Sequence, residues 1–425
     1  MYKLLFYKLF NLQLDKTNQI ISNHIFGKSF RFGKDDATKR LLVLRYFFSV
    51  IRKPIVKIKL LESKEIVFDI SSGAKEIRID YLTHFNGSKS YEFVNLDTYI
   101  SFRTISLKIW FILVNSPLVL ITFFVSLFFK DKSGFALLVQ HKLIWQNLRF
   151  ALENLNNCNI YYFSIYNNSS NYFAHKLINM GHKVIKIPSE VPISMWNSNI
   201  LSSELVICSA YQIEEIEFHK STIQIGNVLF WGPERAHEYI DIYVESKSDD
   251  AKNKIGFYST AGWVRAKLGH MDQGLRMVES EKQVLLLLHK IVSENKKYQL
   301  EIFLHPKEKS MDKTDVNKYY STLLGSDDFV INDIDLPSAH TFDRVDVAIA
   351  FHTTLMYERL YMGFKSIFFP LEMEQFGFPI KGSSIENICA ISEKTLEKMI
   401  LKAMKQSDDE FFESNDLKKY IKNNA

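Results

Sequence analysis

The sequence predicts an α/β protein with two successive parallel-sheet domains. Short apolar strands alternate with helical segments in two blocks, 133–245 and 254–400, and such alternation is typical of parallel sheets joined by helices. The stretch 246–254 between the blocks is polar and charged, as linkers are. The composition agrees, because 47% apolar and 24% charged residues in a chain of 425 are ordinary for two or three folded domains.

The first 132 residues form a basic region, with 21 Lys or Arg against 11 Asp or Glu, so that the rest of the chain is net acidic. Alternating apolar residues predict strands at 54–60, 65–70 and 76–80. We expect these strands to form a small sheet appended to the main body. No small-residue cleavage site follows residues 1–14, which argues against a signal peptide. We interpret them as an amphipathic helix that lies on a surface.

An apolar segment of 21 residues without a charge, 109–129, closes this region. Its length suffices to cross the hydrocarbon core of a bilayer, but Asn115-Ser116-Pro117 near its middle favours a break. Three interpretations remain: a transmembrane helix, a monotopic helix-break-helix that enters one leaflet, and a buried helix pair. Basic residues on both sides favour the first two, because they attract anionic lipid. We therefore expect this region to associate with a membrane surface.

Residues 133–245 are expected to form the first domain. Leucines between 137 and 152 predict a helix. Residues 159–187 then give a strand, a polar turn, a helix ended by Gly181 and a second strand, which together make a βαβ unit of ordinary length. Further strands are predicted at 204–209 and 223–227.

Residues 254–400 are expected to form the second domain. The pattern predicts a strand at 254–258, a long helix at 279–295, strands at 298–304 and 329–331, and a closing strand-helix-strand unit at 347–370. Residues 401–425 are expected to add a helical tail.

The closing unit contains the first candidate site. A buried strand leads to Thr353 and Thr354, whose hydroxyls can cap the next helix. Free N–H groups and the positive end of the helix dipole favour a phosphate there. Glu358 lies one turn further on, where a carboxylate can accept hydrogen bonds from neutral sugar hydroxyls such as a ribose diol. This pattern predicts a nucleotide site; the alternative is a simple helix cap followed by a solvated surface charge.

Two further turns of the second domain offer candidates. Ser259 and Thr260 follow its first strand, and Arg265 comes soon after them; hydroxyls beside a cation suit a diphosphate or an acidic sugar. His305 opens a His-Pro turn at the end of a later strand, where an imidazole can donate to a phosphate or protonate a leaving oxygen, and Lys307 adds charge. The alternative for each turn is a purely structural role.

Together, the two domains, the His-Pro turn and the threonine pair followed by Glu358 resemble the GT-B glycosyltransferases of bacterial surface-polysaccharide assembly. The similarity is to the groups that hold a nucleotide phosphate with an HP motif and a downstream Ser/Thr motif, as the CMP-sialic acid and CMP-Kdo transferases do. It covers about 155–395. By this resemblance His305 contacts the donor phosphate, Thr353 and Thr354 match the Ser/Thr motif, and Glu358 matches the acidic residue near the nucleotide.

The resemblance also implies the architecture and the partners. The fold would be two Rossmann-like domains facing a cleft. The donor would be a nucleotide-sugar, with a CMP-linked acidic sugar favoured, and the acceptor a glycan or a lipid-linked glycan. The protein would lie at the cytoplasmic face of the inner membrane, as a peripheral or monotopic enzyme.

The chain departs from this family at the catalytic base. The family's acidic pair followed by Gly is missing from the first domain. Glu190 is the substitute that we expect, because its loop follows the second strand of the βαβ unit and a carboxylate there can deprotonate an acceptor hydroxyl. The alternative is a solvated loop residue. The missing pair leaves the identity of the donor more open than the fold.

No metal site and no cofactor are expected, since the nucleotide-sugar is a substrate. No Asp-x-Asp motif follows a strand in the first half of the chain. Cys158, Cys208 and Cys389 lie far apart without metal-ligand spacing, which indicates buried thiols in a reducing compartment. Nucleic-acid binding is not expected, because the basic region coincides with the apolar segment and the α/β part is net acidic.

Two other functions fit the same features. A polyol-phosphate transferase of the teichoic-acid type also uses His-Pro turns and works at membranes. A non-catalytic, membrane-bound scaffold of polysaccharide assembly would keep the fold without activity.

Overall fold

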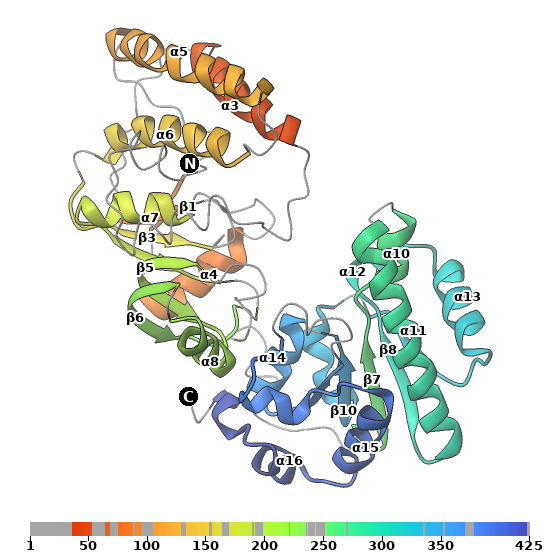
Figure 1. Cartoon of the computed structure of the whole chain (residues 1–425). Helices are drawn as coiled ribbons and strands as arrows, with labels where there is room; N and C mark the ends of the chain where they lie inside the picture. Colours follow the sequence, from red (N-terminus) through yellow and green to blue (C-terminus); the bar gives the residue numbers. More distant parts are fainter. Residues whose placement is uncertain are drawn as a thin grey trace. The chain divides into compact units, whose positions relative to one another are not determined.

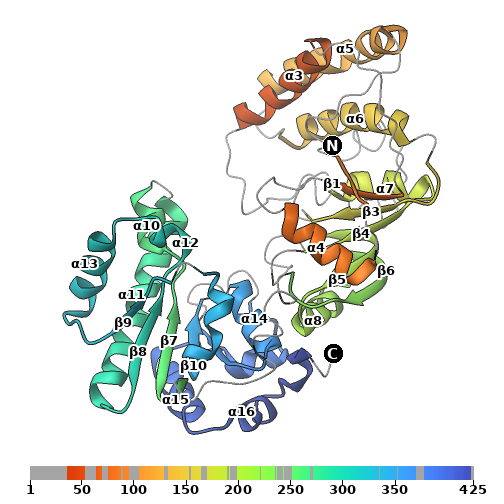
Figure 2. The same ribbon diagram turned by 180° about the vertical axis from the view of Figure 1, so that it is seen from behind.

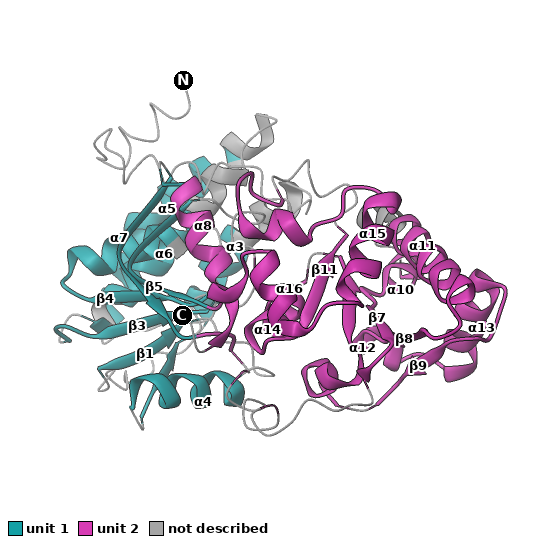
Figure 3. Cartoon of the chain, turned by 90° about the horizontal axis from the view of Figure 1, so that it is seen from below, with its two compact units in different colours: residues 1–189, 196–207, 219–231 teal, residues 190–195, 208–218, 232–425 magenta. Residues whose placement is uncertain are grey.

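The structure is a computed structural model with two compact units (Figures 1 and 3). It describes residues 36–52, 64–68, 75–87, 90–94, 105–128, 133–152, 155–163, 170–188, 191, 199–220, 222–234, 236, 243, 251–268, 271–334, 336–351, 353–369 and 378–422. Unit 1 comprises 1–189, 196–207 and 219–231, and unit 2 comprises 190–195, 208–218 and 232–425. The expected division at 132/133 therefore does not separate compact units.

Unit 1 contains a six-stranded sheet in the order β2-β1-β3-β4-β5-β6, with every neighbouring pair parallel. Its strands are β1 (Glu65–Phe68), β2 (Glu92–Val94), β3 (Asn159–Tyr162), β4 (Lys183–Lys186), β5 (Ile200–Ile207) and β6 (Ile223–Phe230). The predicted βαβ unit is confirmed, since α7 (Ser170–Asn179) joins β3 to β4. Gly181 has a positive φ of 85° after that helix, a conformation that glycine adopts without strain.

The prediction of a separate N-terminal sheet is wrong. β1 and β2 belong to the main sheet of unit 1, and Val67 pairs with Tyr161 of β3. The strand predicted at 76–80 is also wrong, because these residues belong to α4 (Lys75–Asn86). Isoleucines alternate with charged residues there, but burial selects the helical spacing, and Tyr81 and Leu82 form the buried positions. The strand predicted at 54–60 lies outside the described residues.

Helices cover both faces of this sheet. One hydrophobic cluster joins the sheet to α6 (Ser133–Leu152) and α7, and a second one lies on the face covered by α4. Helices α3 (Asp36–Arg52) and α5 (Ile105–Phe128) pack on α6. They form a further layer on the side of α6 that faces away from the sheet (Figure 1). The helix predicted through the leucines at 137–152 is confirmed as part of α6.

The break expected at Asn115-Ser116-Pro117 is wrong, because α5 continues through Pro117. Two side chains stabilise the turn around it: Asn115 Nδ2 donates to the carbonyl of Phe111 at 2.7 Å, and Ser116 Oγ to that of Ile112 at 2.6 Å. The fully buried interpretation of the segment is also wrong, since only 22% of residues 105–122 are buried. Within the described residues, this is the one helix long and apolar enough to cross a membrane.

Unit 2 contains a five-stranded sheet in the order β11-β10-β7-β8-β9, again with every neighbouring pair parallel (Figure 2). Its strands are β7 (Lys254–Tyr258), β8 (Gln299–Phe303), β9 (Val330–Asn332), β10 (Val347–Ala350) and β11 (Lys365–Phe368). The α-helices that the structure describes in this unit are α8 (Ala210–Phe218), α10 (Gly262–Lys267), α11 (Met271–Glu294), α12 (Pro306–Lys309), α13 (Lys313–Leu324), α14 (Thr354–Tyr361), α15 (Glu393–Ala403) and α16 (Asp408–Ser414).

The strands predicted for the second block are confirmed, and so is the helix that ends at Glu294, although it begins at Met271 rather than at 279. The predicted linker 246–254 lies mostly outside the described residues. The C-terminal residues pack on the same unit: Phe411 and Phe412 of α16 are buried, and Tyr420 Oη donates to Glu214 Oε2 at 3.1 Å. All three cysteines are buried free thiols.

Candidate functional site

The strand order of unit 2 locates a ligand crevice. Numbered along the chain, the order β9-β8-β7-β10-β11 is 3-2-1-4-5, and the strand connections reverse direction between β7 and β10. Ligands of open α/β sheets bind outside the carboxyl ends of the strands at such a reversal. The turns that end β7, β8 and β10 begin at Ser259, Leu304 and Phe351. Because the three strands are neighbours, the candidate residues that follow them belong to turns or helices at one edge of this sheet.

An internal carboxylate already occupies the turn between β7 and α10. Glu281, a buried residue of α11, accepts hydrogen bonds from Thr260 N at 2.5 Å, Thr260 Oγ1 at 2.7 Å and Gly262 N at 3.0 Å. Ser259 Oγ lies 3.5 Å from the same carboxylate and accepts from Ala261 N at 2.9 Å. In this structure the donors of Thr260 and Gly262 are directed at Glu281, and diphosphate binding by Ser259 and Thr260 stays a prediction.

Burial raises the pKa of Glu281 to about 7, and the neighbouring Glu308 adds to the rise, while hydrogen bonds from Thr260 and Gly262 oppose it. This carboxyl therefore changes charge near neutral pH inside the turn. The same turn contains Ala261 with φ 57°, a left-handed conformation that is uncommon for a residue other than glycine. The hydrogen bonds to Glu281 hold the residues on both sides of it in place.

The His-Pro turn after β8 is fixed by a second buried carboxylate, that of Glu308. It accepts from His305 N at 2.9 Å, from Trp263 Nε1 at 2.6 Å and from Tyr320 Oη at 2.8 Å. The imidazole of His305 caps the short helix α12, because its Nδ1 accepts from Lys307 N at 3.1 Å. Glu308 was not among the sequence-predicted residues, although its position three residues after the cap is the spacing of a capping box.

This geometry determines the protonation of His305. Burial and the positive charges of Arg265 and Lys307 together lower its pKa to about 4. The imidazole is therefore neutral at pH 7. Since Nδ1 accepts a hydrogen bond, the proton resides on Nε2. The structure thus brings three predicted residues into one electrostatic neighbourhood, with an Nε2–H donor next to two cations.

The cation Arg265 is positioned by the turn itself, because its Nε donates to the carbonyl of Thr260 at 2.9 Å. Arg265 and Lys307 are half-buried. A neutral donor and two cations at the carboxyl end of β8 form an environment that suits an anion such as a phosphate.

The turn between β10 and α14 differs from the expectation. Thr353 occupies the N-cap position of α14 but makes no side-chain cap hydrogen bond, and Thr354 Oγ1 accepts from the backbone N of Val191 at 3.3 Å. The prediction that the two hydroxyls cap this helix is therefore wrong. Val191 belongs to the short segment 190–195 of unit 2, so a loop that follows β4 contacts the start of α14.

Helix α14 is anchored from behind by Arg359, a residue that the sequence did not single out. Its guanidinium is fully buried and donates from Nη1 to the carbonyl of Phe342 at 2.7 Å and to Tyr258 Oη at 3.3 Å. It also lies 5.2 Å from the ring centroid of Phe364. These contacts fix α14 against the sheet and with it the position of Thr353 and Thr354.

Glu358 is not among the charged residues that perturb the pKa of His305. Glu358 is half-buried on α14, and its charge contributes to a raised pKa of the Cys208 thiol, for which burial is the main cause. It therefore faces the segment of unit 2 that includes Cys208. Glu190, the expected base, lies outside the described residues.

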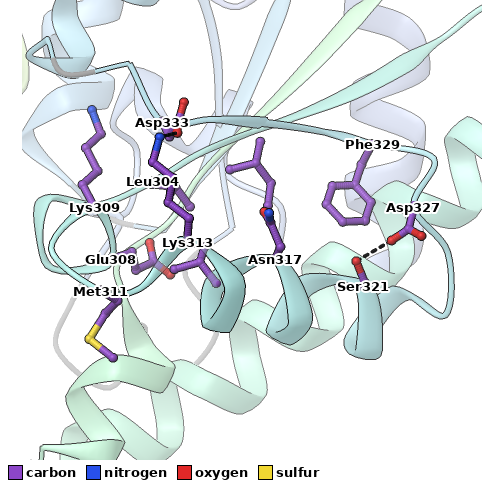
Figure 4. A pocket seen from close by; sticks show the side chains of 12 residues that line it. Leu304, Glu308, Lys309, Met311, Lys313, Asn317, Ser321, Asp327, Phe329 and Asp333 are labelled. Atoms are coloured by element: carbon purple, nitrogen blue, oxygen red, sulfur yellow. Dashed lines mark hydrogen bonds and ion pairs between the residues drawn. The ribbon is translucent and has the colours of Figure 1, made fainter.

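A pocket of about 440 Å³ opens beside the His-Pro turn, between α12, α13 and the region around β9 (Figure 4). Polar groups of the pocket are engaged within the protein, since Lys313 Nζ lies 2.5 Å from Asp333 and Ser321 Oγ donates to Asp327 at 2.5 Å. It lies at the β9 edge of the sheet, two strands away from the reversal at β7 and β10. We therefore place the candidate site at that reversal rather than in this pocket.

Among the described residues, no group of three His, Cys, Asp or Glu side chains is arranged to hold a metal ion. Among the described residues of unit 1, Lys186 at the carboxyl end of β4 is a titratable group in an apolar environment. It is fully buried, donates to Asn171 Oδ1 at 2.5 Å, and has a pKa lowered by burial to about 7.

No protein-family model and no curated protein matches the chain. Solved structures of similar arrangement include glycosyltransferases and related enzymes. A UDP-glucose:anthocyanidin 3-O-glucosyltransferase in complex with UDP matches with a TM-score of 0.42 and 11% identity, over 85% of this chain and 94% of its own. A Listeria monocytogenes protein described as a UDP-N-acetylglucosamine 2-epimerase matches with a TM-score of 0.44 and 10% identity, over 84% and 90%.

The wall teichoic acid polymerase TagF, soaked with CDPG, matches with a TM-score of 0.40 and 10% identity, over 94% of this chain and 90% of its own. At these identities and scores the similarities assign neither a family nor an activity to the chain.

Proposed function

We propose that the chain is a glycosyltransferase of GT-B type that transfers a sugar from a nucleotide-activated donor to a glycan or lipid-linked acceptor in cell-surface polysaccharide biosynthesis. The donor would bind to unit 2 at the carboxyl ends of β7, β8 and β10. We favour a CMP-linked acidic sugar, because two cations next to His305 provide charge for an anionic group in addition to the phosphate.

One observation carries the proposal: His305 is a neutral histidine whose Nδ1 is already engaged, so that Nε2–H is available as a donor beside Arg265 and Lys307. A donor that is fixed before the substrate arrives needs no reorganisation during the reaction. The turn that holds it is rigid, because Glu308 binds the backbone of His305 and two aromatic side chains at once.

In the proposed reaction, a hydroxyl oxygen of the acceptor attacks the anomeric carbon of the donor sugar. The new bond forms between the acceptor oxygen and that carbon, while the bond from the carbon to the donor phosphate oxygen breaks and its electron pair moves to the phosphate. The hydrogen bond from His305 Nε2 and the charges of Arg265 and Lys307 stabilise the leaving phosphate in the role that a divalent metal ion has in other transferases.

Glu190 is the base that we propose for the acceptor hydroxyl, and it would take the proton. Its neighbour in the sequence, Val191, donates to Thr354 Oγ1 at the start of α14. This contact supports the proposal, because it brings Val191, the residue next to Glu190, to the start of α14. Glu358 would contact the hydroxyl end of the nucleotide from the same helix, α14.

A thermal-shift screen of CMP, CDP, UDP and GDP tests the proposal, since a ligand that binds only the folded state raises its apparent stability. We expect one nucleotide to raise the unfolding temperature, and His305→Ala to lose most of that shift. His289→Ala, a partly buried histidine on α11 of the same unit, is the matched control and keeps it. Absence of any shift with the wild-type chain refutes the proposal.

Turnover of the corresponding donors, with and without EDTA, then tests the chemistry. We expect hydrolysis of one nucleotide-sugar, unchanged by EDTA and reduced at least about 100-fold in His305→Ala, as for the loss of one preorganised donor. Consumption of a CDP-linked polyol in place of every sugar donor would instead identify a polyol-phosphate transferase.

A further inference from the structure

Helix α5 of unit 1 presents an unusually apolar outer face. Its exposed side chains include Ile109, Trp110, Leu113, Leu120, Ile121 and Phe124, and the most exposed, Leu113, has 68% of its surface accessible. From Ile109 to Phe128 the helix contains no charged residue. An exposed apolar surface of this extent in a folded protein indicates a site of interaction with a partner or a membrane.

The exposed and buried residues of α5 separate cleanly around its axis. At about 3.6 residues per turn, the exposed positions fall on one half of the helix surface. The opposite side is formed by Phe111, Asn115, Val119 and Thr122, which are at most 3% exposed. The helix is therefore half embedded in unit 1 and apolar on the half that faces solvent.

The buried side attaches α5 firmly to its neighbours. Asn115 Nδ2 donates to Gln146 Oε1 of α6 at 2.8 Å, and Phe111 and Val119 belong to the same hydrophobic cluster as α6 and the sheet. Lys108 Nζ donates to the carbonyl of Ile51 at the end of α3 at 2.9 Å. Figure 1 shows α3 and α5 together as the layer beyond α6.

Helix α3 packs beside α5 and adds further exposed apolar side chains and positive charge. Phe48 and Ile51 are exposed apolar residues of α3, at 50% and 38%. Arg45 and Arg52 of the same helix are exposed as well. Apolar side chains flanked by cations match the chemistry of a bilayer interface, with acyl chains below and anionic headgroups beside them.

We propose that α3 and α5 form an in-plane membrane-docking surface, with the exposed half of α5 inserted into one leaflet of an anionic bilayer. This inference is independent of the glycosyltransferase proposal, because it uses only unit 1 residues. Trp110, at 50% exposure, lies on the inserted face, and tryptophan is favoured at the boundary between headgroups and acyl chains.

The packing of α5 decides between lying in the membrane plane and spanning it. A spanning α5 would carry α3 and α6 into the hydrocarbon, because its buried side is packed on both. These helices carry Arg45, Arg52 and Arg149, all exposed, and charged side chains at the bilayer centre are costly. Insertion of one face into one leaflet keeps these charges at the interface and still buries the apolar half of α5.

Co-flotation of the full chain with liposomes tests this surface. We expect the chain to float with vesicles of phosphatidylcholine and 30% phosphatidylglycerol, and less with phosphatidylcholine alone. The double variant L113E/L120E should bind the anionic vesicles about 100-fold more weakly, since each leucine contributes about tenfold to the transfer from water. Its circular dichroism and unfolding temperature should match the wild type, because both side chains are exposed.

The matched control is L268E/I391E, which places the same charges at two leucine or isoleucine positions of unit 2 that are 62% and 66% exposed. It should float like the wild type. Flotation of L113E/L120E equal to the wild type, or no flotation of the wild type with either vesicle, overturns the proposal. A wild-type dimer in light scattering that L113E/L120E converts to monomers, without flotation, also overturns it and assigns the face to a second copy of the chain.

Tryptophan quenching measures the depth. Lipids brominated near the headgroup end of the acyl chain should quench the fluorescence of the wild type, and Trp110→Phe should lose most of that quenching. Stronger quenching by bromine near the end of the acyl chain would place Trp110 at the bilayer centre and contradict the in-plane arrangement.

Discussion

Replacement of Glu281 by glutamine is expected to change how the stability of unit 2 depends on pH. Burial raises the pKa of Glu281 from 4.5 to about 7 in the folded state. A carboxyl with a raised folded pKa contributes its full stabilisation below pH 4.5 and loses it as the pH rises through 7. With these two values, the contribution of Glu281 to the free energy of unfolding falls by about 2.5 kcal/mol between pH 5 and pH 8.

The glutamine side chain cannot titrate, so the variant lacks this fall. It also turns an NH₂ group toward Gly262 N or Thr260 N, which leaves one buried donor unpaired and costs about 1 to 3 kcal/mol. The difference in unfolding free energy, wild type minus Glu281→Gln, should therefore be positive at pH 5 and decrease by about 2.5 kcal/mol at pH 8.

Urea titrations at pH 5, 6, 7 and 8 measure this difference. The transition of unit 2 can be followed through Trp263, whose ring stacks on Tyr319 with centroids 4.6 Å apart, and Trp263→Phe identifies its signal. Glu279→Gln is the control, since that side chain is on the same helix and 68% exposed, and its difference should not vary with pH. A Glu281→Gln difference that stays constant to within about 0.5 kcal/mol, or rises with pH, refutes the argument.

Three further perturbations have defined outcomes. Glu308→Ala removes the acceptor of three donors and should lower the free energy of unfolding in urea by about 3 kcal/mol. The control Glu413→Ala, at an exposed position, should change it by less than about 0.5 kcal/mol. An equal effect of the two substitutions would contradict the hydrogen-bond network of Glu308. Lys186→Met should stabilise unit 1 at pH 7 by on the order of 3 kcal/mol. The reason is the lowered pKa of the lysine, because of which the wild type gains stability only as the pH rises from 7 toward 10.5. A loss of stability in the variant would show that the ammonium group is needed. Pro117→Ala should raise the thermal stability of unit 1 by about 1 to 3 kcal/mol, since it restores a backbone N–H inside a continuous helix, and a lower stability would indicate that the helix breaks there.

The sequence predicted elements correctly where the local pattern of apolar and polar residues matches the burial in the structure. The strands of unit 2 are apolar runs that end in polar turns, so β7, β8 and β10 were predicted together with the turns that follow them. His305 was recognised because a His-Pro pair at the end of a buried strand is a local signal. The neutral charge state of His305 was not predicted, because it depends on burial and on the charges of Arg265 and Lys307 in the folded structure.

Long-range contacts account for what was missed. Glu281 lies 21 residues after Thr260, before the apolar run of α11, and no spacing rule connects the two. The strands β1 and β2 were separated from the main sheet because pairing between Val67 and Tyr161 crosses a long stretch of chain. In α4, alternation of isoleucine with charged residues imitated a strand, and only the burial of Tyr81 and Leu82 selects the helix.

We propose that a nucleotide binds unit 2 at the carboxyl ends of β7, β8 and β10. Hydrogen exchange followed by mass spectrometry tests it most directly, with the nucleotide that gives the largest thermal shift. We predict slower exchange in peptides that cover 259–268, 304–311 and 353–361, loss of this protection in His305→Ala, and unchanged exchange in α5 and α6. Protection confined to peptides of unit 1, or protection that His305→Ala retains in full, would contradict the account.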